Sequence, residues 1–136
     1  MIEITSKPIS PGQVIKRAKT SGSGCVATYV GLIRDTSHDK KVVSVEYQDR
    51  DGKAIEKLRK IADETGQKWH VENIAFTHRI GKLRVGDINL VVAVAAAHRQ
   101  EGFAACQHII NRFKESLPTY KIETYEDGST LDGGTL

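Results

Sequence analysis

The 136-residue chain has few of the features that mark several common classes of protein. Its two cysteines, Cys25 and Cys106, are too few for a disulfide framework and too far apart for a compact metal-binding motif. No apolar run approaches the roughly 18 residues that a membrane-spanning helix needs. Aromatic residues make up 6% of the sequence, and the formal net charge is only +3. We therefore expect no metal site, no membrane segment and no general nucleic-acid-binding surface.

The remaining composition is that of an ordinary globular protein, with 39% hydrophobic and 27% charged residues. The N-terminal segment has neither a basic leader followed by an apolar block nor a lipidation signature, so we expect a soluble, cytoplasmic protein. The glycine-rich end of the chain has little apolar content. We therefore predict one domain over residues 1–128 and a flexible C-terminal tail over residues 129–136.

Hydrophobic periodicity predicts the order of helices and strands. The predicted strands cover residues 2–4, 25–33, 42–47, 71–78, 88–96 and 119–125, and the predicted helices cover 11–18, 51–65 and 101–117. Ser10 and Pro11 are a helix start, Gly66 is the predicted end of the second helix, and residues 36–41 are predicted to be a mobile loop. The resulting order, β-α-β-β-α-β-β-α-β, favours an α+β domain with a mainly antiparallel sheet.

The last predicted helix carries an apolar stripe with spacings of 3, 4, 3 and 4 residues, and Pro118 ends it. This stripe consists of Phe103, Cys106, Ile110, Phe113 and Leu117. Lys114 lies about 40° around the helix from Ile110, at the edge of the stripe. We therefore expect the alkyl stem of Lys114 to be packed and its amine to point in a defined direction.

Cationic side chains stand at the ends of predicted elements. Arg34 follows one strand, the pair His98 and Arg99 follows another, and Lys121 shares one side of the last strand with Glu123. Each alone could be an ordinary solvated side chain. Together they predict an electropositive pocket for phosphate or carboxylate, in which a lysine could act as acid, base or nucleophile. His98 and Arg99 could meet Lys121 only through a partner strand or subunit, which the sequence leaves open.

Four ordered motifs carry a more specific signal. They are GLIRD at residues 31–35, HRIGKL with a following Gly-Asp at residues 78–87, AHR with a later Phe at residues 97–103, and a lysine followed by PTYKIE at residues 114–123. Over roughly residues 2–128, this set resembles the large, catalytic subunit of molybdopterin synthase, the MoaE family. Taken alone, His78 in the second motif is predicted to be structural.

The resemblance implies an α/β hammerhead fold and a homodimer. It further implies a small ubiquitin-like sulfur-carrier subunit at each end, giving a heterotetramer. The implied reaction converts cyclic pyranopterin monophosphate (precursor Z) to molybdopterin, with two sulfurs transferred from the C-terminal Gly-Gly thiocarboxylate of the carrier to form the dithiolene. No metal or organic cofactor is expected for this step.

The resemblance also implies roles for individual residues. Lys114 and Lys121 match the catalytic lysines, with Lys121 as the principal acid or base and Lys114 positioning the phosphate or the carrier terminus. The implied substrate-binding set is Leu32, Ile33, Arg34, His98, Arg99, Lys114, Lys121, Ile122 and Glu123. Two departures from the family pattern are Tyr120, where a Trp is frequent, and Leu131, where an aromatic residue is common.

Two other interpretations fit parts of the sequence. A non-catalytic module could recruit an acidic or ubiquitin-like partner through the same basic surface. An RNA-binding domain is the weaker alternative, because the chain lacks aromatic residues interleaved on a basic strand face.

Overall fold

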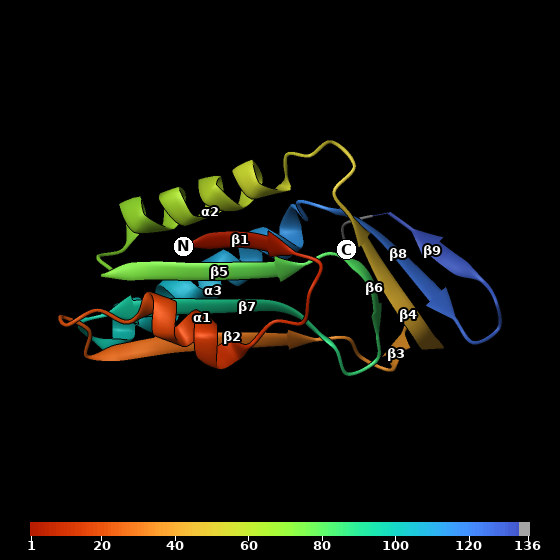
Figure 1. Cartoon of the computed structure of the whole chain (residues 1–136), viewed down its shortest axis with the longest axis horizontal. Coiled ribbons are helices and arrows are strands. Elements are labelled where there is room, and N and C mark those ends of the chain that lie inside the picture. Colours follow the sequence, from red (N-terminus) through yellow and green to blue (C-terminus); the bar gives the residue numbers. More distant parts are fainter. Residues whose placement is uncertain (134–136) are drawn as a thin grey trace.

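A computed structural model describes residues 1–133 as two β-sheets that lie next to each other, with three helices packed on the first sheet (Figure 1). The first sheet has the order β1 (Ile2–Thr5), β5 (Asn73–Arg79), β7 (Ile88–Ala96), β2 (Cys25–Leu32). Helix α1 (Pro11–Ala18) covers one face, and α2 (Ala54–Lys68) and α3 (Arg99–Glu115) cover the other. Among the described strands, only the β1–β5 pair is parallel.

The second sheet has five strands. Its order is β3 (Thr36–Ser37), β4 (Lys40–Gln48), β8 (Tyr120–Tyr125), β9 (Thr130–Asp132), and β6 (Gly81–Arg84) also pairs with β4. All its described pairings are antiparallel. The predicted α+β class with a mainly antiparallel sheet is therefore confirmed, although the strands divide into two sheets.

The apolar strand β7 forms the centre of the core. Its side chains alternate between two clusters, as the period of a strand requires. Val92 and Val94 pack towards α2 and α3, and Val91 and Ala93 pack towards α1. A strand that is buried on both faces is a rigid base from which the polar residues at its two ends can be presented.

Helix α1 begins as the sequence predicts. The Ser10 hydroxyl accepts a hydrogen bond from the Gln13 amide at 3.3 Å, and Pro11 occupies the first helical position.

Helix α3 places a different face against the sheet from the predicted one. Its buried positions are Gly102, Ala105, Cys106, Ile109 and Phe113. Phe103 is 65% exposed, so its predicted place in the buried stripe was wrong. The reason is the small residue beside it. A Cβ on Gly102 would lie 3.3 Å from the Cys25 sulfur, so the helix approaches the sheet there and turns Phe103 outwards.

Residues 36–41 form a hairpin instead of the expected mobile loop. Thr36 pairs with Lys41 and Ser37 with Lys40, and the two residues between them have φ angles of 52° and 60°. Left-handed angles of this kind are typical of a two-residue hairpin turn. The turn residues are His and Asp, without the glycine that would have indicated such a turn in the sequence.

Two further boundaries differ from the predictions. Helix α2 runs three residues beyond the predicted Thr65 end to Lys68, so Gly66 lies inside the helix and does not end it. The predicted C-terminal tail contains β9, whose residues pair with β8 after a turn at Gly128, where φ is +86°. The last three residues, 134–136, lie outside the described part of the chain.

Candidate active site

One end of the molecule contains a small cavity of about 120 Å³ between the two sheets, which we call the lysine pocket. Its charged lining residues are Arg34, Lys114, Lys121 and Glu123. The remaining lining residues are Leu32, Ile33, Thr36, Ser37, Val42, Val45, Tyr47 and Asn89. Residues from the end of β2, from β3 and β4, from the start of β7, from the last turn of α3 and from β8 thus meet in one place.

Lys121 is held by a buried carboxylate. Its amine lies 3.9 Å from Oε1 of Glu123, a residue that is only 5% exposed. Ser37 donates a hydrogen bond of 3.2 Å to the same oxygen. Lys121 and Glu123 share one side of β8 because they are two positions apart. The Lys121 amine thus lies at the cavity wall beside a buried carboxylate.

Two other cations line the pocket without a carboxylate partner among the described residues. Arg34 and Lys114 are both exposed, and neither makes an ion pair within residues 1–133. With Lys121 they place three cations against one buried carboxylate, so the pocket is suited to an anionic ligand.

Sequence reasoning missed four polar residues of this pocket, which are Thr36, Ser37, Tyr47 and Asn89. Tyr47 accepts a hydrogen bond of 2.9 Å from the Asn89 amide, and burial raises the pKa of its hydroxyl. The phenol therefore stays protonated at neutral pH and remains a hydrogen-bond donor. Asn89 offered a signal, as a lone amide near the start of an otherwise apolar strand. Tyr47 offered none, because an aromatic residue in a strand is usually core.

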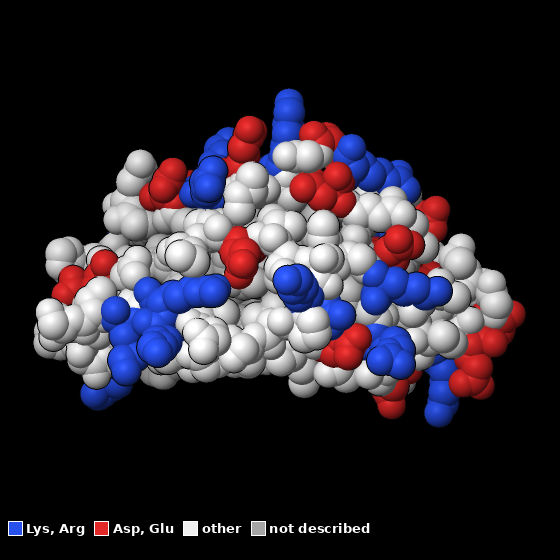
Figure 2. Space-filling model, in the orientation of Figure 1, with Lys and Arg blue, Asp and Glu red and all other residues white. Residues whose placement is uncertain are grey.

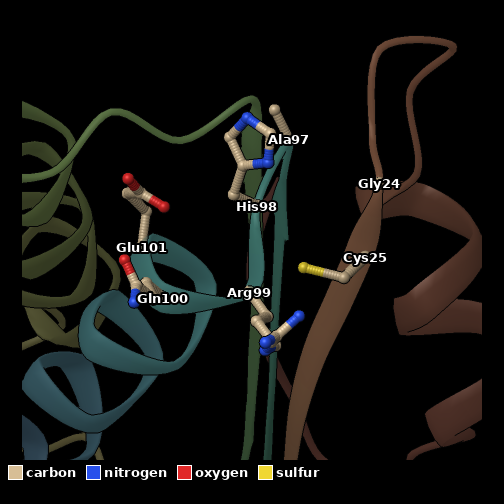
Figure 3. Close-up of a pocket in the computed structure, with 7 residues that line it drawn as sticks. All are labelled: Gly24, Cys25, Ala97, His98, Arg99, Gln100 and Glu101. Atoms are coloured by element: carbon tan, nitrogen blue, oxygen red, sulfur yellow. The ribbon is translucent and has the colours of Figure 1, made fainter.

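A larger cavity of about 510 Å³ lies at the start of α3, and we call it the arginine cavity. Its lining residues are Gly24, Cys25, Ala97, His98, Arg99, Gln100 and Glu101. Figure 3 shows Gln100 and Glu101 on the first turn of α3 and the Cys25 sulfur pointing from β2 towards that turn. His98 is the N-cap residue of α3, and no side chain caps the first amides of the helix there. These amides, with His98 and Arg99, suit a phosphate group.

The two cavities lie at opposite ends of the same elements. Strand β7 has Asn89 at the lysine pocket and ends next to the arginine cavity, which at about 3.4 Å per residue separates the two by roughly 25 Å. Helix α3 runs from Arg99 to Lys114 and beyond, a rise of about 22 Å over these fifteen steps. Within one chain, His98 and Arg99 therefore do not meet Lys114 or Lys121.

Basic and acidic side chains are mixed on the surface of the molecule. Figure 2 shows lysine and arginine side chains interspersed with acidic ones across the face in view. Within residues 1–133, no group of three His, Cys, Asp or Glu side chains is arranged to hold a metal ion. No described helix has both the length and the apolar character for crossing a membrane.

Comparison with known proteins agrees with the motifs. Residues 4–116 match the model of the family described as MoaE protein. The chain belongs to the MoaE family.

Members of the MoaE family resemble the chain over nearly its whole length. The molybdopterin synthase catalytic subunit of Bacillus subtilis (strain 168) is 34% identical over 134 residues, which cover 98% of this chain and 85% of that protein. The crystal structure of molybdopterin synthase from Staphylococcus aureus contains a chain with a TM-score of 0.89 and 32% identity, with 97% and 96% of the two chains covered. A complex of subunits 1 and 2 of the molybdopterin-converting factor from Helicobacter pylori, at 14% identity and a TM-score of 0.75, shares the fold.

The nine residues that the MoaE motifs single out thus divide into three groups. Leu32, Ile33, Arg34, Lys114, Lys121 and Glu123 line the lysine pocket. His98 and Arg99 line the arginine cavity. Ile122 lines neither, since it alternates with its neighbours and points to the other side of β8.

Proposed function

We propose that this MoaE-family chain is the catalytic subunit of a molybdopterin synthase. It converts cyclic pyranopterin monophosphate to molybdopterin with sulfur from a small thiocarboxylated carrier. The observation that carries this proposal is the lysine pocket, where two lysines from separate motifs meet beside a buried glutamate. Its relatives are named as catalytic subunits of this enzyme.

The lysine pocket suits the carrier's C-terminus. A Gly-Gly tail has no side chains, so it can enter a cavity of about 120 Å³ that would exclude bulkier residues. Its terminal thiocarboxylate is an anion, and Arg34, Lys114 and Lys121 supply cations at the walls. Leu32 is 56% exposed at the same site and offers an apolar contact to the body of the carrier.

The arginine cavity suits the pterin substrate. Its volume of about 510 Å³ falls in the usual range for small-molecule sites, and one end combines Arg99 with the free amides at the start of α3. A guanidinium can bind two phosphate oxygens at once, and His98 adds a further donor.

Sulfur transfer requires the thiocarboxylate and the pterin to meet, yet the two cavities of one chain are more than 20 Å apart. A homodimer resolves this separation if the arginine cavity of one subunit faces the lysine pocket of the other. With one carrier at each lysine pocket, the assembly is a heterotetramer. The Helicobacter pylori complex of two subunits, which contains a chain of the same fold, is consistent with a small-subunit partner.

Lys121 is the principal acid or base in this scheme. Opening the cyclic phosphate and adding sulfur both need proton transfers, and the Lys121 amine is held at the pocket wall by Glu123. Lys114 positions the carrier terminus from the last turn of α3.

The test is product formation from purified chain, cyclic pyranopterin monophosphate and thiocarboxylated carrier, with oxidised molybdopterin measured by fluorescence. We expect the parent chain to form product and Lys121→Ala to lose about 100-fold or more in rate while it still binds carrier. Lys16→Ala, which removes an exposed lysine on α1, should behave as the parent.

Two results would contradict the proposal. Full turnover by Lys121→Ala would remove this lysine from the chemistry. No product from the parent, with a carrier known to be active, would favour the non-catalytic binding module.

A further inference from the structure

His78 is fully buried on β5, directly behind the lysine pocket. Its Nδ1 lies 2.9 Å from the Asn89 carbonyl oxygen, and its Nε2 lies 2.9 Å from the Thr119 hydroxyl. A carbonyl oxygen can only accept, so Nδ1 carries the proton and Nε2 of the neutral ring accepts from Thr119. Burial lowers the pKa of His78 to about 4, which keeps the ring neutral at physiological pH.

Thr119 connects His78 to the start of β8, the strand that carries Lys121. Thr119 lies in the bend that leads from α3 into β8, immediately before the strand and two residues before Lys121. Thr119 is 5% exposed and is fixed by its bond to His78. The start of β8 is thus anchored to the core two residues before Lys121.

The same imidazole also supports the pocket from two other sides. Its ring packs edge-on against Tyr47 and Phe113, each with a centroid distance of 4.9 Å. Tyr47 is the cross-strand partner of Lys121, and Phe113 immediately precedes Lys114 on α3. One side chain therefore contacts the neighbours of both lysines.

We propose that the hydrogen-bonded pair His78 and Thr119 positions the Lys121 amine in the lysine pocket. Neither residue lines the cavity, so both act through Lys121 and are positioning residues. This inference rests on the proposed function of Lys121. It goes beyond a structural role, because a pair that served only the fold would leave the geometry of the amine unchanged when its hydrogen bond is removed.

The decisive variant is Thr119→Val, which keeps the shape of the side chain and removes the hydroxyl that donates to His78. We expect kcat for molybdopterin formation to fall by about 10- to 100-fold, because small displacements of a catalytic group have effects of this size. The KM for the pterin and the affinity for the carrier should stay as in the parent. Thr119→Ser restores the hydroxyl and should recover most of the lost rate.

Thr65→Val is the matched control. Thr65 is also fully buried, and its hydroxyl donates a bond of 2.7 Å to the Ile61 carbonyl inside α2, away from the pocket. It should lose stability without losing kcat per folded molecule. Equal losses of kcat in Thr65→Val and Thr119→Val, or failure of Thr119→Ser to restore the rate, would overturn the proposal.

A second measurement does not depend on catalysis. In chain with isotope-labelled lysine, the Lys121 side-chain signal can be identified by its loss in Lys121→Arg. We expect it to shift in Thr119→Val and to stay in place in Thr65→Val. An unchanged signal in Thr119→Val would overturn the positioning role. Absence of product from the parent would instead count against the proposed function, and the lysine signal would still decide on the positioning.

Discussion

The lysine pocket and the arginine cavity use similar residues in different ways. The lysine pocket is narrow, draws on both sheets and on α3, and holds Lys121 against a buried glutamate that also binds Ser37. The arginine cavity is about four times larger and is lined by two short stretches of chain, residues 24–25 and 97–101. Its basic side chains, His98 and Arg99, are exposed.

This difference suggests how far one chain alone positions the polar groups of each cavity. At the lysine pocket the polar groups are already oriented by neighbours, which is the condition for a catalytic group. At the arginine cavity, exposed basic side chains flank a wide opening, which is the condition for a surface that a ligand or a second subunit completes. The first of the following predictions tests whether the two cavities form one site across a dimer, and the other two test the lysine pocket and the arginine cavity separately.

The strongest test uses heterodimers of two inactive variants. Lys121→Ala and Arg99→Ala should each lose about 100-fold or more in rate as homodimers. A heterodimer with one subunit of each kind should recover about half of the parent activity, because one of its two symmetric sites has both groups intact. Product formation by heterodimers isolated with two different affinity tags measures this.

The reciprocal pair is the control. A heterodimer of the double variant Lys121→Ala, Arg99→Ala with a parent subunit should be nearly inactive, because each shared site then lacks one group. If the site instead lay within one chain, this pair would keep half of the activity and the first pair would have none.

The sequence could predict residues of the lysine pocket and of the arginine cavity separately, because each group belongs to a local pattern. The buried strand that stops at His98, and the alternation that puts Lys121 beside Glu123, are short-range signals. The distance between the two cavities could not be predicted, because it depends on the lengths and packing of β7 and α3. The contact between His78 and Thr119 could not be predicted either, since the two residues lie 41 residues apart and no local pattern links them.

The errors in the predicted fold have equally local causes. Phe103 is apolar but stands next to Gly102, and periodicity alone does not indicate which residue contacts the sheet. The β3–β4 hairpin turns through His38 and Asp39 in left-handed conformations that glycine or asparagine usually occupies. In both cases tertiary packing decided between options that the sequence pattern left nearly equal.

Acidification should weaken the support of the lysine pocket. His78 has a pKa of about 4 in the folded chain against about 6.5 when unfolded, so the unfolded chain binds more protons between these values. Stability is therefore full above about pH 6.5 and falls as the pH drops towards 4, by up to about 3 kcal/mol from this residue. Denaturant unfolding at a series of pH values measures how the unfolding free energy changes with pH.

His78→Gln, which cannot titrate, is the control for this slope. Its unfolding free energy should change less over the same pH range, whatever its absolute stability. Equal slopes in the two proteins would mean that other groups cause the acid effect. Direct titration of the His78 ring by NMR in the parent chain gives the same answer if the variant folds poorly.

A smaller effect is expected from a change at the arginine cavity. In Gly24→Ala the new Cβ would collide with the carbonyl oxygen of Ala97, which is backbone and cannot turn away. We expect a loss of about 1–3 kcal/mol in unfolding free energy. Crowding beside His98 should also raise the KM for the pterin while carrier binding at the lysine pocket is retained.

Gly66→Ala is the matched substitution. Nothing lies within 4 Å of a Cβ at this exposed position inside α2, so alanine should stabilise the chain by about 0.5–1 kcal/mol. Denaturant titration of both variants checks the opposite signs. A raised KM in Gly66→Ala as well would show that the effect at Gly24 is not local.

The place of β8 in the second sheet also affects the synthesis of the chain. All four strands of the first sheet precede residue 97, but β4 receives β8 as its neighbour only when residues 120–125 have been made. The chain between β4 and β8 is about 70 residues long, which takes on the order of several seconds at the ribosome. During that time one edge of β4 remains unpaired and open to wrong partners. Pairing of β8, the strand that carries Lys121, closes this edge of β4 and so removes a site for wrong strand pairing in the nascent protein.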